Sequence, residues 1–134
     1  MPLLLKDECG KASSAFEAAT CWIEGTFVKK DGSAIALAHM ISLTLTLYDK
    51  KTGDIINSRN IHSVLNENGG TVSALGVLSL ELAPADNVIV TAGQTPGSKE
   101  RHVARLIWTW NSGSGPKTGK EELEFEVEVL AEVP

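Results

Sequence analysis

The 134-residue sequence has few cysteines, few aromatic residues and no long apolar run. Cys9 and Cys21 form no CxxC pair and have no metal-ligand companions nearby, which argues against a disulfide-dense scaffold or a zinc finger. Two reduced thiols are the favoured interpretation, and a disulfide across the short loop between them is the alternative. The three leucines at 3–5 are too few for a signal-peptide core, and no stretch approaches a membrane span. We therefore expect a protein that is made and kept inside a cell.

Positive charge is also scarce, because 12 Lys and Arg face 17 Asp and Glu, for a net charge of −5. Nucleic-acid binding through phosphates and docking on anionic membranes both need clustered cations, so neither is expected. The 43% apolar and 22% charged content is ordinary for a soluble globular chain. A chain of this length can form one domain with its own core.

The strongest positive signal is an alternation of period two, which is typical of strands with one buried face. Three segments carry it, at 41–48, 106–110 and 122–129, and Gly, Asp and Asn residues that favour turns lie between them. Further strands are expected at 20–28, 54–61, 71–82 and 87–92. We expect a two-layer antiparallel β-sandwich whose core contains Leu43, Leu45, Leu106, Trp108, Phe125 and Val127.

The charged segment Asp49–Asp54 interrupts two apolar stretches and contains Gly53. It predicts a strand-to-strand turn, with Leu47 and the pair Ile55-Ile56 in the core on either side. The segment "NSGSGPKTGK" (111–120) predicts a long flexible loop.

The N-terminal arm, residues 1–19, is expected to lie outside the sandwich domain, residues 20–134. Ser14 and Glu17 match a capping box, so "SSAFEAA" predicts one or two turns of helix. An extended or mobile arm is the alternative.

No catalytic, cofactor-binding or metal-binding residue is predicted. The segment "GPKTGK" fails as a phosphate-binding loop because Ser114 and Glu121 stand where a glycine and a hydroxyl residue belong. The alternating Glu122, Glu124, Glu126 and Glu128 predict a solvated outer face, offset by Arg101 or Arg105 on a neighbouring strand. His39, His62 and His102 show no recognised ligand spacing.

The three tryptophans could form a stacking platform for a sugar or peptide. Trp108 and Trp110 share the apolar phase of Leu106, so core packing is favoured for them. The position of Trp22, core or surface, stays open.

The order of several motifs is similar to that of small immunoglobulin-like proteins encoded among the structural genes of tailed bacteriophages and prophages. The motifs are "FVKKDGSAI", "SLTLTLYDKKTGDIINSR", "LSLELAPADNVI", "RHVARLIWTWNSGSG" and "EELEFEVEVL", and the resemblance covers roughly residues 20 to 130. Trp110 stands where that group usually has tyrosine, and its proline-bearing lead into the second strand is missing at 36–40.

The resemblance implies an immunoglobulin-like antiparallel sandwich of about seven strands and a non-enzymatic role in the virion or its assembly. The implied partners are other virion proteins, with a weak homo-oligomer as a further expectation and no nucleic acid, membrane or small-molecule substrate. The implied location is the host cytoplasm during assembly and then the virion. The alternative is a bacterial cell-surface adhesion or carbohydrate-binding module. The resemblance carries over no functional residues. In the motif at 56–59, Asn57 and Ser58 are expected to bond the backbone and Arg59 to pair with an outer-face glutamate.

Overall fold

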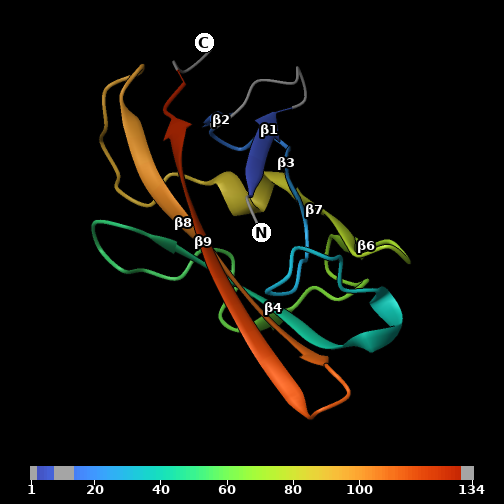
Figure 1. Ribbon diagram of the computed structural model, residues 1–134. Helices are drawn as coiled ribbons and strands as arrows, with labels where there is room; N and C mark the ends of the chain where they lie inside the picture. The colour runs from blue at the N-terminus through green and yellow to red at the C-terminus, as the bar shows by residue number, and fades with distance from the viewer. Residues whose placement is uncertain (1–2, 8–13, 131–134) are drawn as a thin grey trace.

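The computed structural model describes residues 3–7 and 14–130, which form two β-sheets around a common core (Figure 1). Sheet A has the strand order β1-β3-β7-β6, and sheet B has the order β2-β9-β8-β4-β5. The strands are β1 (Leu4–Asp7), β2 (Ser14–Phe16), β3 (Cys21–Thr26), β4 (Met40–Asp49), β5 (His62–Ser63), β6 (Gly70–Val72), β7 (Val77–Leu82), β8 (Lys99–Asn111) and β9 (Pro116–Glu128). Two short 3-10 helices are η1 (Leu37–His39) and η2 (Pro84–Asn87). The expected all-β, two-layer architecture is confirmed.

Alternating apolar residues of both sheets meet in one core. All six residues predicted there are buried, and the most exposed of them, Trp108, has only 5% of its surface in contact with solvent. The Trp108 ring packs against Phe27 of the opposite layer, with ring centroids 5.1 Å apart. It also lies over Gly119, its partner across the β8–β9 pair, where any Cβ would collide with the indole. The absence of a side chain at 119 therefore makes room for the largest side chain of the core.

The N-terminal segment differs most from expectation, because the predicted helix at 14–17 is wrong. Residues Ser14–Phe16 form strand β2, which pairs in parallel with β9, so the sandwich is not wholly antiparallel. Strand β1 pairs antiparallel with β3 in the other sheet. Leu5 and Ala15 are both buried in the core. The described part of the arm is thus extended and packed into the sandwich.

Two expected strands are absent from the described residues, and one is divided. Residues 54–61 form a bridge at Ile55 and then turns, with left-handed backbone at Asn57, Ser58 and Ile61, which a continuous strand does not tolerate. Of residues 87–92, Asn87 ends η2 and the rest follow it without joining a sheet. The segment 71–82 is divided into β6 and β7 by a turn at 73–76. The described residues therefore form nine strands, four of which are only two to four residues long, where the sequence predicted about seven.

Two turns also need correction. The long loop expected at 111–120 is a hairpin, because β9 starts at Pro116 and Asn111 pairs with it, leaving only 112–115 as the connection. The turn 49–54 is present, with Gly53 N–H donating to the Asp49 carbonyl, but its two isoleucines behave differently. Ile56 is buried, whereas Ile55 is 42% exposed.

Strand β4 changes phase at its start. The pairing with β8 shifts by one residue between Met40 and Ser42, which marks a bulge. Ile41 is the extra residue and is exposed, although the alternation through Leu43 to Leu47 predicted it to be buried.

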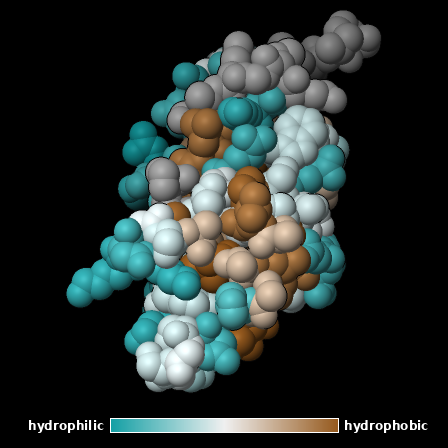
Figure 2. Space-filling model, turned by 45° about the vertical axis from the view of Figure 1, so that its right-hand side comes forward, coloured by the Kyte–Doolittle hydropathy of each residue, from teal (hydrophilic) through white to brown (hydrophobic). Residues whose placement is uncertain are grey.

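The outer face of sheet A carries exposed apolar side chains beside polar ones. Leu4 and Val77 are 40% and 46% exposed, and they line a shallow depression together with Leu3, Glu24, Gly25, Thr26 and Val28. Figure 2 shows this side of the molecule, with apolar side chains gathered near the middle of the face. We call the surface formed by Leu3, Leu4, Val28 and Val77 the outer apolar patch. Among the described residues, no helix has the length and hydropathy needed to span a bilayer.

Candidate functional site

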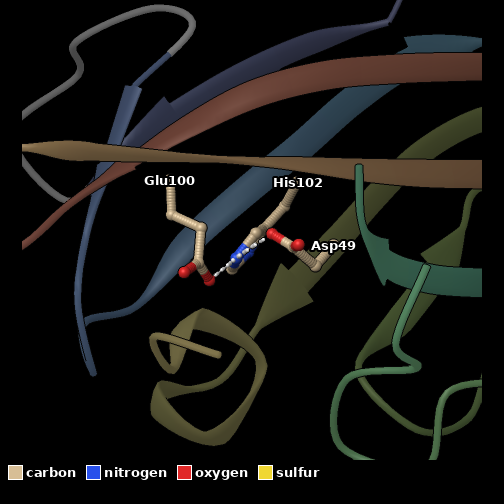
Figure 3. A group of neighbouring side chains, drawn as sticks. All are labelled: Asp49, Glu100 and His102. Atoms are coloured by element: carbon tan, nitrogen blue, oxygen red, sulfur yellow. Dashed lines mark hydrogen bonds and ion pairs between the residues drawn. The ribbon is translucent and has the colours of Figure 1, made fainter. Parts of the chain in front are cut away.

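A cluster of titratable side chains lies at one end of sheet B, where β4 ends and β8 begins (Figure 3). The register of the β4–β8 pair places Asp49 directly opposite His102. Glu100 lies two residues before His102 on β8, and alternation along a strand turns both side chains to the same face. That face looks into the sandwich, so Asp49, Glu100 and His102 are 1%, 7% and 0% exposed. We call these three residues the carboxylate–histidine cluster.

The imidazole lies between the two carboxylates. His102 Nε2 is 2.6 Å from Glu100 Oε1, a short hydrogen bond, and 3.9 Å from Asp49 Oδ1. The ring also packs edge-on against Phe125 of β9, with centroids 5.9 Å apart. These contacts fix the orientation of the ring, while its other nitrogen, Nδ1, is buried without a hydrogen-bond partner.

The Glu100 carboxylate is held by the loop that covers it. Its Oε1 accepts the backbone N–H of Val90 at 2.7 Å, and its Oε2 accepts Thr91 N–H at 3.0 Å and the Gln94 side-chain amide at 2.8 Å. Burial by itself would raise the pKa of Glu100, but the hydrogen bonds from His102, Val90 and Thr91 together hold that pKa below its ordinary value. Hydrogen bonds thus tie the Glu100 carboxylate to His102 and to the loop 88–94.

Asp49 has two oxygens in different situations. Its Oδ2 accepts the backbone N–H and the hydroxyl of Thr52 at 2.9 and 3.0 Å, which closes the turn 49–54. Its Oδ1 is buried, aimed at His102 Nε2, and has no hydrogen-bond partner. A buried carboxylate oxygen without a donor destabilises the fold, so its presence calls for an explanation beyond packing.

The ligand atoms of the cluster lie within 4.8 Å of one another and could hold a metal ion. A second chemical possibility is a histidine–carboxylate pair acting as general base. His102 is 0% exposed, so a substrate cannot reach the imidazole. Metal binding or a structural role therefore fits this geometry better than catalysis.

Sequence reasoning missed this cluster. The signal that could have found part of it is Glu-x-His on a strand, which places two ligand types on one face. Asp49 gave no such signal, because its position at the start of a Gly-containing turn explains it completely as a turn residue.

A second buried polar group joins two of the motifs on which the phage resemblance rests. Arg59 Nε and Nη2 donate to Asp86 Oδ1 and Oδ2 at 2.9 and 3.0 Å, a bidentate ion pair that is almost wholly buried. Asn57 Nδ2 and the Ala83 backbone N–H donate to the same carboxylate. The expectation that Arg59 pairs with an outer-face glutamate is therefore wrong, and Asn57 bonds a side chain instead of the backbone.

The outer face of sheet B matches its prediction. Arg105 pairs with Glu122 at 3.1 Å, and Arg101 lies 3.6 Å from both Glu124 and Glu126. The pKa of Glu124 is held below its ordinary value by a hydrogen bond from Lys50, at 2.6 Å. The glutamates are thus a solvated, paired face.

The other candidate residues do not converge. Lys120 of the rejected phosphate loop lies within β9, and His39 and His62 are remote in register from His102. Cys21 is a free, buried thiol, and burial raises its pKa to about 11. Cys9 falls outside the described residues. Trp22 is half-buried on the outer face of sheet A, where it lines a polar hollow with Gly69, Gly70, Thr71, Ser79 and Glu81.

Comparison of the chain with protein-family models, with curated proteins and with solved structures gave no match.

Proposed function

We propose that this chain is a non-enzymatic structural or assembly protein of a tailed-phage virion, associated with the capsid, neck or tail, and that it acts through protein–protein contacts. The observation that carries the proposal is the outer apolar patch. Leu4 and Val77 belong to different strands of sheet A, yet both expose their side chains on the same face, next to Val28 and Leu3.

An apolar patch of this kind favours a partner. Water contact with apolar surface is unfavourable by roughly 25 cal/mol per Å², and burial against another protein removes that cost. The depression is shallow and about 600 Å³ in volume, a shape that suits a protein surface better than a small molecule. In a virion each such contact is repeated in many copies, so individually weak contacts hold collectively.

The two-sheet architecture supports the immunoglobulin-like assignment that the motif order implies. The Arg59–Asp86 ion pair gives a physical reason for two of these motifs to occur together, because it joins the segment 56–59 to the segment 82–86 inside the fold. The net charge of −5 favours protein partners over nucleic acid or an anionic membrane. The proposal places the protein in the host cytoplasm during assembly and then in the virion, as a monomer or weak homo-oligomer when free.

A carbohydrate-binding module is the second candidate, and the hollow beside Trp22 favours it. An indole flanked by hydroxyl and carboxylate groups from Thr71, Ser79 and Glu81 can stack on a sugar ring and bond its hydroxyls. Glycan-array binding that is lost in Trp22→Ala, with the fold retained, would favour this candidate over the first.

The test of the virion role uses particles of the parent phage. Mass spectrometry of purified particles should detect the protein, and Val77→Lys should strongly reduce its incorporation. Thr118→Lys, on the exposed face of sheet B, is the matched control and should incorporate normally. Particles that contain none of this protein would refute the virion role. Normal incorporation of Val77→Lys would show that the contact does not use the outer apolar patch.

A further inference from the structure

Asp49 Oδ1 is buried, and none of the described residues donates a hydrogen bond to it. Asp49 Oδ1 and Glu100 Oε1 both approach the same imidazole nitrogen, His102 Nε2, at 3.9 and 2.6 Å. That nitrogen can carry only one proton, and the shorter contact uses it. Protonating the ring would add a proton at Nδ1, which faces neither carboxylate and has no partner. A histidine in either charge state therefore leaves Asp49 Oδ1 unsatisfied.

The cluster also has an excess of negative charge. Two carboxylates are buried with one imidazole, and in the described ranges no lysine or arginine forms an ion pair with Asp49 or Glu100. The basic residues next to the two carboxylates in sequence, Lys50, Lys99 and Arg101, pair on the outer face with Glu124 or Glu126. Buried charges are normally paired or bound to metal, because isolated ones are expensive in a low-dielectric interior.

We propose that Asp49, Glu100 and His102 form a site for a divalent transition-metal ion, with Zn²⁺ the best fit. A cation placed among Asp49 Oδ1, Glu100 Oε1 and His102 Nε2 satisfies all three atoms at once, which a single proton cannot do. It also neutralises two carboxylates beside a neutral imidazole. The donor set of one nitrogen and two oxygens selects against Ca²⁺ and Mg²⁺, which prefer oxygen alone.

The distances fit such an ion with small movements. Metal–ligand bonds of about 2.0–2.2 Å in a tetrahedral site place neighbouring ligand atoms about 3.3 Å apart. The 2.6 Å contact between His102 and Glu100 lies below that value and the 3.9 Å contact to Asp49 lies above it. Binding therefore needs the imidazole to move away from Glu100 and toward Asp49, and the two carboxylate oxygens, which lie within 4.8 Å of each other, to adjust their spacing as well.

The surroundings hold the two carboxylate ligands in the way that metal sites require. Glu100 is fixed by the N–H groups of Val90 and Thr91, and Asp49 is fixed through its other oxygen by Thr52. Such outer hydrogen bonds orient carboxylate ligands and reduce the cost of ordering them. Because the three ligands are nearly excluded from solvent, the ion is structural. It joins the turn 49–54 and the loop 88–94 to strand β8.

The test uses tag-free, full-length protein, stripped with a chelator and dialysed. Elemental analysis after incubation with Zn²⁺ and removal of free metal should give close to one equivalent per chain. The melting temperature should rise by about 10 °C at a free Zn²⁺ concentration one hundred times Kd, and Mg²⁺ should have little effect. Co²⁺ bound in place of Zn²⁺ should give a visible absorption band that reports the ligand field independently of stability.

Two isosteric variants locate the ion. Asp49→Asn keeps the shape and the bond to Thr52 but weakens the ligand, so Zn²⁺ affinity should fall at least tenfold while the apo protein still melts cooperatively. Asp54→Asn, on the exposed side of the same turn, is the matched control and should bind as the parent does. The proposal is overturned if Zn²⁺ neither binds nor shifts the melt, which would show that only water or a proton occupies the cluster. It is equally overturned if Asp49→Asn binds with unchanged affinity, because the ion would then lie elsewhere.

Discussion

Replacing Arg59 with methionine tests the energetic role of the buried ion pair. The Arg59 side chain is 7% exposed and that of Asp86 is 0% exposed, and two parallel hydrogen bonds of 2.9 and 3.0 Å join them. Methionine fills most of the same volume but donates nothing. The Asp86 carboxylate would then keep only two neutral donors, Asn57 and the Ala83 backbone N–H.

The expected loss in the free energy of unfolding follows from leaving the Asp86 carboxylate buried without its counter-ion. Removal of one partner of such a pair costs about 3–5 kcal/mol, because the remaining charge keeps its desolvation penalty and loses its compensation. With a urea m-value of about 2 kcal/mol/M, the unfolding midpoint should fall by about 2 M. The double variant Arg59→Met/Asp86→Asn should cost less than the sum of the two single variants, since it leaves no unpaired charge.

The assay is urea unfolding followed by the fluorescence of the three tryptophans. Arg105→Met is the matched control, because Arg105 pairs with Glu122 on the surface, with 40% of its side chain exposed. Surface pairs contribute about 0–1 kcal/mol, so this control should barely move the midpoint. If Arg59→Met and Arg105→Met lose similar amounts, or if the double variant is simply additive, the argument from buried charge is refuted.

Three further outcomes are expected. Phe125→Ala should cost about 3–5 kcal/mol in denaturant melts while Glu126→Ala stays near neutral, and equal losses would mean that the inward phase of β9 is misassigned. Deletion of residues 1–12 should lower the melting temperature by several degrees, because it removes β1 and the fully buried Leu5; an unchanged melt would show that β1 is dispensable. Cys21 should react with a thiol reagent at pH 8 only after unfolding, since burial raises its pKa to about 11. For the same reason its contribution to stability is complete below pH 9 and is lost as the pH rises toward 11; rapid native-state labelling at pH 8 would contradict the burial.

The sequence predicts the long strands well for a physical reason. In β4, β8 and β9 one face is buried and the other meets water, so alternation records the fold directly. Alternation does not predict the structure of a short segment that is decided by pairing with a distant strand. Ser14–Phe16 has helix-forming neighbours, but pairing with β9 decides its structure, and tertiary contacts override local propensity in so short a piece.

The buried polar groups could not be predicted because their partners are distant in sequence. Asp49 meets His102 only through the register of β4 and β8, and Arg59 meets Asp86 across a sequence separation of 27 residues. Neither contact leaves a local pattern. The acidic outer face was predictable, since its charges alternate along a single strand.

The parallel pairing of β2 with β9 has a consequence for biosynthesis. The partners of residues 14–16 are residues 126–128, so β2 cannot complete its pairing until a strand more than 100 residues later in the sequence has been synthesised. Until β9 is complete, β8 also lacks its long hairpin partner. The unpaired backbone groups along that edge of sheet B can then pair with other chains. Closure of that edge depends on contacts between residues more than 100 apart in sequence, which favours slow folding on a scale of milliseconds to seconds. A chain truncated before residue 116 should therefore be sensitive to protease in sheet B and should associate with other copies of itself through the open edge of β8.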